Sequence, residues 1–223
     1  QEMNLDRSVF VFGLGVDDVK GMYGTTKDLH KIFGDERNFD TPLSEDAMTG
    51  LGIGMAMNGF RPIHIHQRFD FLLLCMNQLI NMAAKVKYLS NGKDSCPLIV
   101  RAIIGRSWGQ GAQHSQSFHS FLSSIPGLTV LAPVTPHDMF NSMIWATKYD
   151  NPVIMVENRM LYKNEGLVVI GVPSNSFNQE KDEDSEVKEF CEVNFNINFP
   201  LTTIIEVKGK NAHEVFKWAK ENH

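Results

Sequence analysis

The sequence lacks several features that would assign it quickly to a class. Its 223 residues carry a net charge of −5, so there is no excess of Lys and Arg to bind nucleic-acid phosphates. Its longest apolar runs, such as "FLLLCM", fall far short of the roughly 20 residues that a membrane span needs. We therefore expect neither nucleic acid nor a membrane among its partners.

Cysteine is scarce as well. Cys75, Cys96 and Cys191 are widely spaced and odd in number, which favours free thiols in a reducing compartment. None of them has the CxxC or Cys/His spacing of a structural zinc site, so no metal site is predicted. No cationic start followed by an apolar core indicates a signal peptide. These points favour the cytoplasm or an organelle matrix, between which the sequence does not distinguish.

Short β-branched or aromatic runs alternate with longer helical patterns through the first two thirds of the chain. Strands are expected at residues 8–15, 62–67, 97–104, 129–133 and 152–157, and helices at 25–34, 70–89 and 136–149. This alternation predicts an α/β fold with a doubly wound, mostly parallel sheet and helices on both faces. In such sheets ligands collect at the carboxyl ends of the strands.

Residues 40–59, "DTPLSEDAMTGLGIGMAMNG", follow a short strand and open another helix. Ser44 or Thr41 can cap this helix, and Glu45 and Asp46 fall in its first turn, where the helix dipole favours acids. Either both acids only complement the dipole or one of them also faces a ligand, and the spacing leaves both interpretations open.

Three glycines in this helix, Gly50, Gly52 and Gly54, cost helix stability unless something packs closely against them. They predict tight contact with another backbone.

Aromatic and imidazole side chains give further candidates, each with a structural alternative. Phe71 opens the helix expected at 70–89 and is either a core residue or a platform for a cofactor. His64 and His66 alternate on one strand face, and without a third ligand we expect a packed or hydrogen-bonded pair. His114 lies in the glycine-containing segment "WGQGAQHSQSFH", with no acid within six residues, and is either an exposed loop residue or a functional one.

The joint order of these candidates gives a family resemblance. Residues 8–162 resemble the pyrimidine-binding domain of the beta subunit of thiamine-diphosphate-dependent 2-oxo acid dehydrogenases. The segments that carry the resemblance are "FGDERNFDTPLSEDAMTGLGIGMAMNGFRPI", "DFLLLCMNQLINMAAK", "GQGAQHSQS", "IPGLTVLAP" and "DNPVIMVEN".

The resemblance implies a role for three residues. Glu45 matches the glutamate that hydrogen-bonds a ring nitrogen of the aminopyrimidine and assists removal of the thiazolium proton. Such an acid should be shielded from water so that it can pass a proton near neutral pH. Phe71 matches the aromatic residue that stacks on the aminopyrimidine. His114 matches the active-site histidine of "QHSQ", and a mobile, neutral loop would let its imidazole approach the reacting carbon.

Two departures from the family pattern qualify the resemblance. The segment "IHIHQRFD" has Ile65 where many members have an acid, and adds His64, His66 and Arg68, so the choice of 2-oxo acid stays open. There is also no GDG followed by Asn, the pattern that holds magnesium and the diphosphate. The resemblance therefore implies an alpha subunit that supplies that half, a lipoyl-bearing acyltransferase as acyl acceptor, a homo-dimer or hetero-tetramer, and a chain inactive alone.

The end of the sequence resembles something else. Residues 166–223 are expected to form a short βαβα tail, and they resemble part of a glutathione-peroxidase-like protein of thioredoxin fold. Gln179 lies close to that family's active-site glutamine, whereas Cys191 is interpreted as packing and the segment bearing the peroxidatic residue is missing. We therefore divide the chain into domains 1–165 and 166–223. The alternatives are a peroxidase-like fragment, or a chimeric or truncated chain without activity, joined near Tyr162–Val169.

Overall fold

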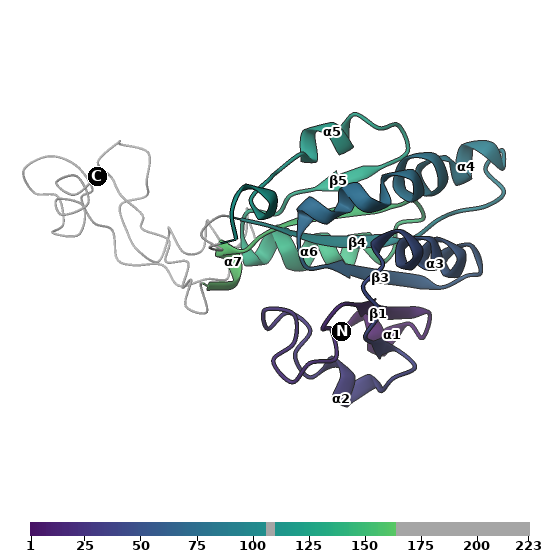
Figure 1. The fold of residues 1–223 in the computed structure, drawn as a ribbon. Coiled ribbons are helices and arrows are strands. Elements are labelled where there is room, and N and C mark those ends of the chain that lie inside the picture. The colour runs from purple at the N-terminus through teal and green to yellow at the C-terminus, as the bar shows by residue number, and fades with distance from the viewer. Residues whose placement is uncertain (106–109, 164–223) are drawn as a thin grey trace, which may run out of the picture. The chain divides into compact units, whose positions relative to one another are not determined.

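The computed structural model describes residues 1–105 and 110–163, all within the first of two units of the chain, Gln1–Asn164. Its centre is one six-stranded sheet in which every paired strand is parallel, in the order β2-β1-β3-β4-β6-β5 (Figure 1). The strands are β1 (Val9–Gly13), β2 (Asn38–Phe39), β3 (Arg61–His66), β4 (Ile99–Ile104), β5 (Thr129–Leu131) and β6 (Val153–Asn158). The predicted parallel α/β fold is confirmed. The expected tail lies outside the described residues.

Helices cover both faces of the sheet. The α-helices are α1 (Glu2–Leu5), α2 (Leu29–Phe33), α3 (Glu45–Met57), α4 (Val86–Leu89), α5 (His119–Ser123), α6 (Pro136–Ala146) and α7 (Met160–Lys163). One core joins α3 and α5 to one face, through residues such as Ile53 and Leu122. The other core joins α1 and α6 to the opposite face, through Met3 and Ala146. None of the described helices has the length and apolarity needed to cross a membrane.

The helix expected at residues 70–89 is present without a break, but it is not a regular α-helix. It consists of η1 (Phe69–Cys75), η2 (Gln78–Met82), η3 (Ala83–Lys85) and α4, of which η1 and η3 are 3₁₀-helices and η2 is a π-helix. Phe69, Leu72 and Cys75 are buried at a spacing of three, which matches the three residues per turn of a 3₁₀-helix. This burial explains why η1 is wound more tightly than the α-helix that the sequence predicts.

The glycines of α3 do not meet another backbone in the described structure, contrary to expectation. A methyl group added at Gly52 would lie 3.0 Å from the ring of Phe12 and 3.1 Å from Leu98, so this glycine lets α3 approach sheet side chains. Gly54 faces open space, and the nearest group to Gly50 is the side chain of Gln78. Of these three glycines, Gly52 is therefore the one that permits close packing among the described residues.

Two of the three cysteines are free and buried, as expected for reduced thiols. Burial raises the pKa of both Cys75 and Cys96 to about 11, so they act as small apolar core residues. Cys191 lies outside the described residues.

Candidate functional site

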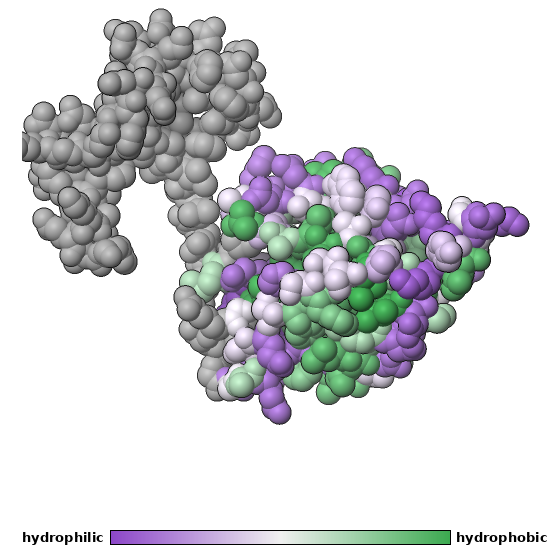
Figure 2. All heavy atoms as spheres, turned by 90° about the horizontal axis from the view of Figure 1, so that it is seen from above, coloured by the Kyte–Doolittle hydropathy of each residue, from purple (hydrophilic) through white to green (hydrophobic). Residues whose placement is uncertain are grey.

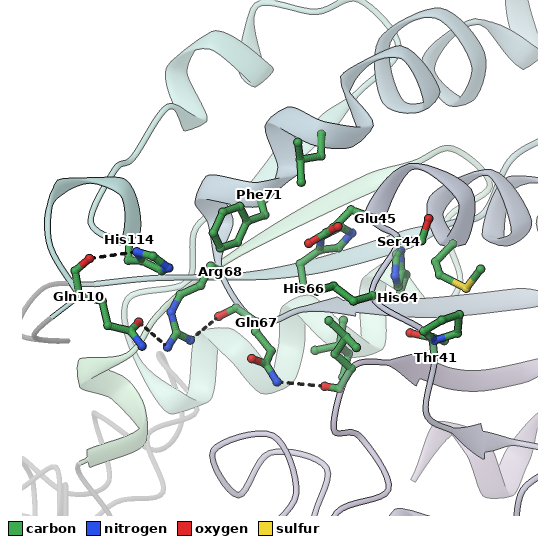
Figure 3. A pocket seen from close by; sticks show the side chains of 16 residues that line it. Thr41, Ser44, Glu45, His64, His66, Gln67, Arg68, Phe71, Gln110 and His114 are labelled. Atoms are coloured by element: carbon green, nitrogen blue, oxygen red, sulfur yellow. Dashed lines mark hydrogen bonds between the residues drawn. The ribbon is translucent and has the colours of Figure 1, made fainter.

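A cavity of about 350 Å³ lies at the carboxyl ends of β1 and β3, where a parallel sheet collects ligands. Its walls come from the loop before α3, the end of β3, the start of η1 and the segment around η4 (Ala112–His114). Glu45, Phe71 and His114, the three residues singled out from the sequence, all line it (Figure 3). Residues 106–109, which include the first two residues of the glycine-containing segment, lie outside the described residues.

Glu45 reaches the cavity because it is the first residue of α3. Ser44 occupies the N-cap position, but its side chain makes no capping hydrogen bond, so the cap expected from it does not form. Asp46, the second acid of the turn, instead accepts a hydrogen bond from Gln78 Nε2 at 3.0 Å and does not line the cavity. Only Glu45 of the two faces the site.

The shielding expected for Glu45 is incomplete in this chain by itself. Its side chain is half-buried because the cavity opens onto the protein surface. A second surface placed over the opening would be needed to exclude water from the carboxylate.

Phe71 and His114 lie against each other in the cavity wall. Their ring centroids are 5.3 Å apart and the rings are nearly perpendicular, at 81°. His114 Nδ1 lies 3.0 Å from the backbone oxygen of Gln110, and because a carbonyl only accepts, Nδ1 carries the hydrogen. In the neutral ring, Nε2 is then left with a lone pair and can accept a proton.

An acid does hold the loop that carries His114, although none is near it in sequence. The buried carboxylate of Asp70 accepts a hydrogen bond from the backbone nitrogen of Gln116 at 2.8 Å. Asp70 fixes the backbone just after His114, whereas the imidazole itself bonds to the backbone oxygen of Gln110. The sequence analysis did not assign a role to Asp70. The feature that could have indicated one is an ionisable side chain next to Phe71 in an otherwise apolar run.

His64 and His66 form the packed and hydrogen-bonded pair that the sequence predicts. Both are buried on β3, with ring centroids 4.3 Å apart. Thr49 Oγ1 lies 3.4 Å from His64 Nδ1 and 3.5 Å from His66 Nε2. His64 also stacks on Phe12. Burial lowers the pKa of His66 to about 4, while burial and the neighbouring His66 hold the pKa of His64 well below its usual value. The described residues contain no group of three or more metal-ligating side chains.

Arg68 forms the cationic end of the cavity. Its Nη2 donates to Gln110 Oε1 at 3.0 Å, and its Nη1 donates to the backbone oxygen of Gln67 at 2.9 Å and to the hydroxyl of Tyr23. The guanidinium also lies 5.6 Å from the centroid of the Tyr23 ring. Figure 3 shows Arg68 and His114 on one side of Phe71 and Glu45 on the other.

Comparison with known proteins gives two family matches. The model "Transketolase, pyrimidine binding domain" matches residues 1–165. The glutathione peroxidase model matches residues 144–220 and so overlaps the first match. The two matches share residues 144–165. Of these, the described residues 144–163 contain the last residues of α6 and the whole of β6 and α7. Gln179 and Cys191 lie outside the described residues.

Curated relatives include beta subunits of two dehydrogenases. The chain is 39% identical over 177 residues to the 2-oxoisovalerate dehydrogenase subunit beta of Bacillus subtilis (strain 168), covering 79% of this chain and 53% of that protein. It is 41% identical over 162 residues to the pyruvate dehydrogenase E1 component subunit beta of Rickettsia bellii (strain RML369-C), covering 73% and 50%. The chain thus spans about half the length of these relatives.

A solved structure has the same fold. It is described as "Split gene transketolase, inactive beta4 tetramer", with a TM-score of 0.56, 17% identity, and coverage of 70% of this chain and 46% of that one. At this identity the likeness concerns the fold alone.

Proposed function

The chain belongs to the transketolase pyrimidine-binding domain family, and from that membership we propose that it supplies the aminopyrimidine-binding half of a thiamine diphosphate site. The observation that carries the proposal is one cavity that brings together a carboxylate at a helix start, an aromatic ring and an imidazole. Its volume and its mainly apolar walls with a few polar groups fit a planar heteroaromatic ring. The reaction is the oxidative decarboxylation of a 2-oxo acid by a beta-type subunit, as the names of the relatives suggest.

In this proposal each residue acts on a defined group. Glu45 hydrogen-bonds a ring nitrogen of the aminopyrimidine and moves a proton at that atom. Phe71 packs against the ring and orients it, and His114 presents Nε2 toward the reacting carbon. When bound, thiamine diphosphate supplies the nucleophilic carbon and the electron sink.

We assign the magnesium ion and the diphosphate to an alpha subunit, because the described residues offer no cluster of metal ligands. The face of the chain shown in Figure 2 supports a partner of this kind, since apolar side chains gather over its helices. Exposed apolar residues on α3, η1, η2 and α5 include Leu51, Leu73, Leu74, Met82 and Phe121. The same partner would close the cavity over Glu45, and a lipoyl-bearing acyltransferase would accept the acyl group.

The test uses the full chain mixed with a cognate alpha subunit, thiamine diphosphate and magnesium, with 2-oxo acid decarboxylation followed by an artificial electron acceptor. We expect Glu45→Gln to lower kcat roughly 10²- to 10⁴-fold, because it removes the acid that exchanges a proton. The matched control is Asp46→Asn, which alters the adjacent acid outside the cavity and should leave kcat within about threefold. Equal activity of the wild type and Glu45→Gln would remove Glu45 from the mechanism.

A second candidate rests on the match of residues 144–220 to the glutathione peroxidase model. Peroxide consumption with a thiol donor tests it, and activity that survives Glu45→Gln would favour it over the decarboxylase. The overlap of the two family matches also supports a join of two coding segments near Tyr162–Val169, between domains 1–165 and 166–223. Peptide mapping of the isolated protein, together with sequencing of source DNA across the join, distinguishes a continuous gene from an artefact.

A further inference from the structure

The cavity that contains Glu45 is electrostatically divided. Among the described residues that line it, Glu45 is the only carboxylate and Arg68 the only side chain with a permanent positive charge. The two lie on opposite sides of Phe71 (Figure 3). A ligand that fills the whole cavity therefore meets an acid at one end and a guanidinium at the other.

Arg68 is held in a fixed orientation before any ligand arrives. Its Nη2 donates to the side chain of Gln110, and its Nη1 donates both to the backbone of Gln67 and to the hydroxyl of Tyr23, whose ring also contacts the guanidinium. A guanidinium whose rotamer is already restricted loses less entropy when it binds an anion. Arg68 is half-buried, so solvent ions screen its positive charge less than they screen that of a fully exposed arginine.

Gln110 connects Arg68 to His114. Its side-chain oxygen accepts from Arg68, and its backbone oxygen accepts from the His114 ring. Arg68 therefore lies at the end of the cavity where the imidazole is presented, away from the end where Glu45 would hold the aminopyrimidine. This is the space that the substrate would occupy.

A 2-oxo acid has a carboxylate at C1, which leaves as carbon dioxide when the C1–C2 bond breaks. A cation bound to that group stabilises the substrate more than the transition state, in which the carboxylate loses its charge, and so slows the reaction. A guanidinium in this position favours catalysis only if it binds a carboxylate that the substrate keeps. We infer that Arg68 binds a second, retained carboxylate and that the preferred substrate is a 2-oxo dicarboxylic acid, an inference that rests on the proposed function.

The test compares three five-carbon 2-oxo acids that differ only at the far end: a terminal carboxylate (2-oxoglutarate), its amide, and a terminal methyl group (2-oxovalerate). With the assembled complex of this chain and its alpha partner, we expect kcat/KM to be roughly 10- to 100-fold higher for the dicarboxylate, which is the strength of a charged hydrogen bond. Arg68→Gln should lower kcat/KM for the dicarboxylate by that factor and leave 2-oxovalerate within about threefold. Arg68→Lys should fall between the two.

Lys85→Gln is the matched control, because it removes one positive charge outside the cavity, where Lys85 Nζ donates to the backbone oxygen of Pro126. Calorimetric binding of glutarate to the same complex gives a readout without turnover, and Arg68→Gln should weaken it by the same factor. An equal loss for all three substrates would show that Arg68 only ties Tyr23 to Gln110, and would overturn the inference. Turnover of 2-oxovalerate without preference for the dicarboxylate would overturn it and leave the proposed function intact, whereas no turnover of any 2-oxo acid removes both.

Discussion

Two buried polar clusters lie on opposite faces of the same sheet, and they tolerate burial in different ways. On the α3 face, His64 and His66 share the hydroxyl of Thr49. On the α6 face, Arg101 of β4 forms a bidentate ion pair with Glu157 of β6, one bond of which is 2.8 Å long. The Tyr162 hydroxyl donates to the same carboxylate.

The difference is one of charge. The histidine cluster stays buried by remaining neutral, because burial lowers the pKa of both rings. The arginine cluster keeps both charges. Burial alone would lower the pKa of Arg101, but the charge and hydrogen bonds of Glu157, together with Tyr162, offset this and the pKa is raised. The neutral cluster lines the cavity that contains Glu45, whereas Arg101 and Glu157 do not line it. The comparison indicates that buried polar side chains in this fold are accommodated either by losing their charge or by pairing it.

The largest effect is expected from breaking the ion pair. Arg101→Met leaves the fully buried carboxylate of Glu157 without its cation, and should lower the free energy of unfolding by about 3–5 kcal/mol. Denaturant unfolding measures it. The double variant Arg101→Met with Glu157→Leu removes both charges and should recover most of the loss. If the double variant is no more stable than the single one, the loss comes from packing and not from an unpaired charge.

A smaller effect is expected from acid. The folded pKa of His66 is about 4 and the ordinary value is 6.5, so between these limits the unfolded chain binds a proton that the folded chain does not. The neutral ring contributes fully to the free energy of unfolding above pH 6.5. This contribution is lost as the pH falls, and the loss is about 3 kcal/mol near pH 4. Unfolding of the wild type and of His66→Phe at several pH values measures it. We expect a flatter profile for the variant, and parallel profiles would contradict the prediction.

The smallest effect is expected at Thr49. Thr49→Val keeps the shape of the side chain but removes the hydroxyl that faces both imidazoles, and should cost about 1 kcal/mol because both hydrogen bonds are long. Thr49→Ser, which keeps the hydroxyl, is the control in the same unfolding experiment. A serine variant that loses more stability than the valine variant would indicate that the methyl group, and not the hydroxyl, is what matters here.

The sequence was a good guide to whatever depends on local pattern. β-branched runs such as "PLIVRAII" predicted the parallel strands, and the histidine spacing on β3 predicted a packed pair. Contacts between distant segments were missed, because periodicity does not specify them. Asp70 reaching Gln116, Thr49 between the two histidines, and Arg101 opposite Glu157 all depend on register and loop path.

Glu45 shows a different limit. Its place at the start of α3 follows from the sequence, but its exposure depends on what covers the cavity, and a single chain does not determine that. The mixture of tighter and wider turns in the 70–89 helix is a similar case, because the burial of Phe69, Leu72 and Cys75 at a spacing of three depends on tertiary packing and not on helix propensity.

Gln110 holds Arg68 through its side chain and His114 through its backbone. Its carboxamide contacts Arg68, whereas its main-chain carbonyl fixes the hydrogen on His114. Replacement of the side chain therefore removes one of the contacts that orient the guanidinium and leaves in place the carbonyl that fixes the tautomer of the imidazole. Under the proposed function, a library confined to position 110 would screen for altered substrate selectivity without altering the proton chemistry, which makes this residue a natural starting point for redesigning the site.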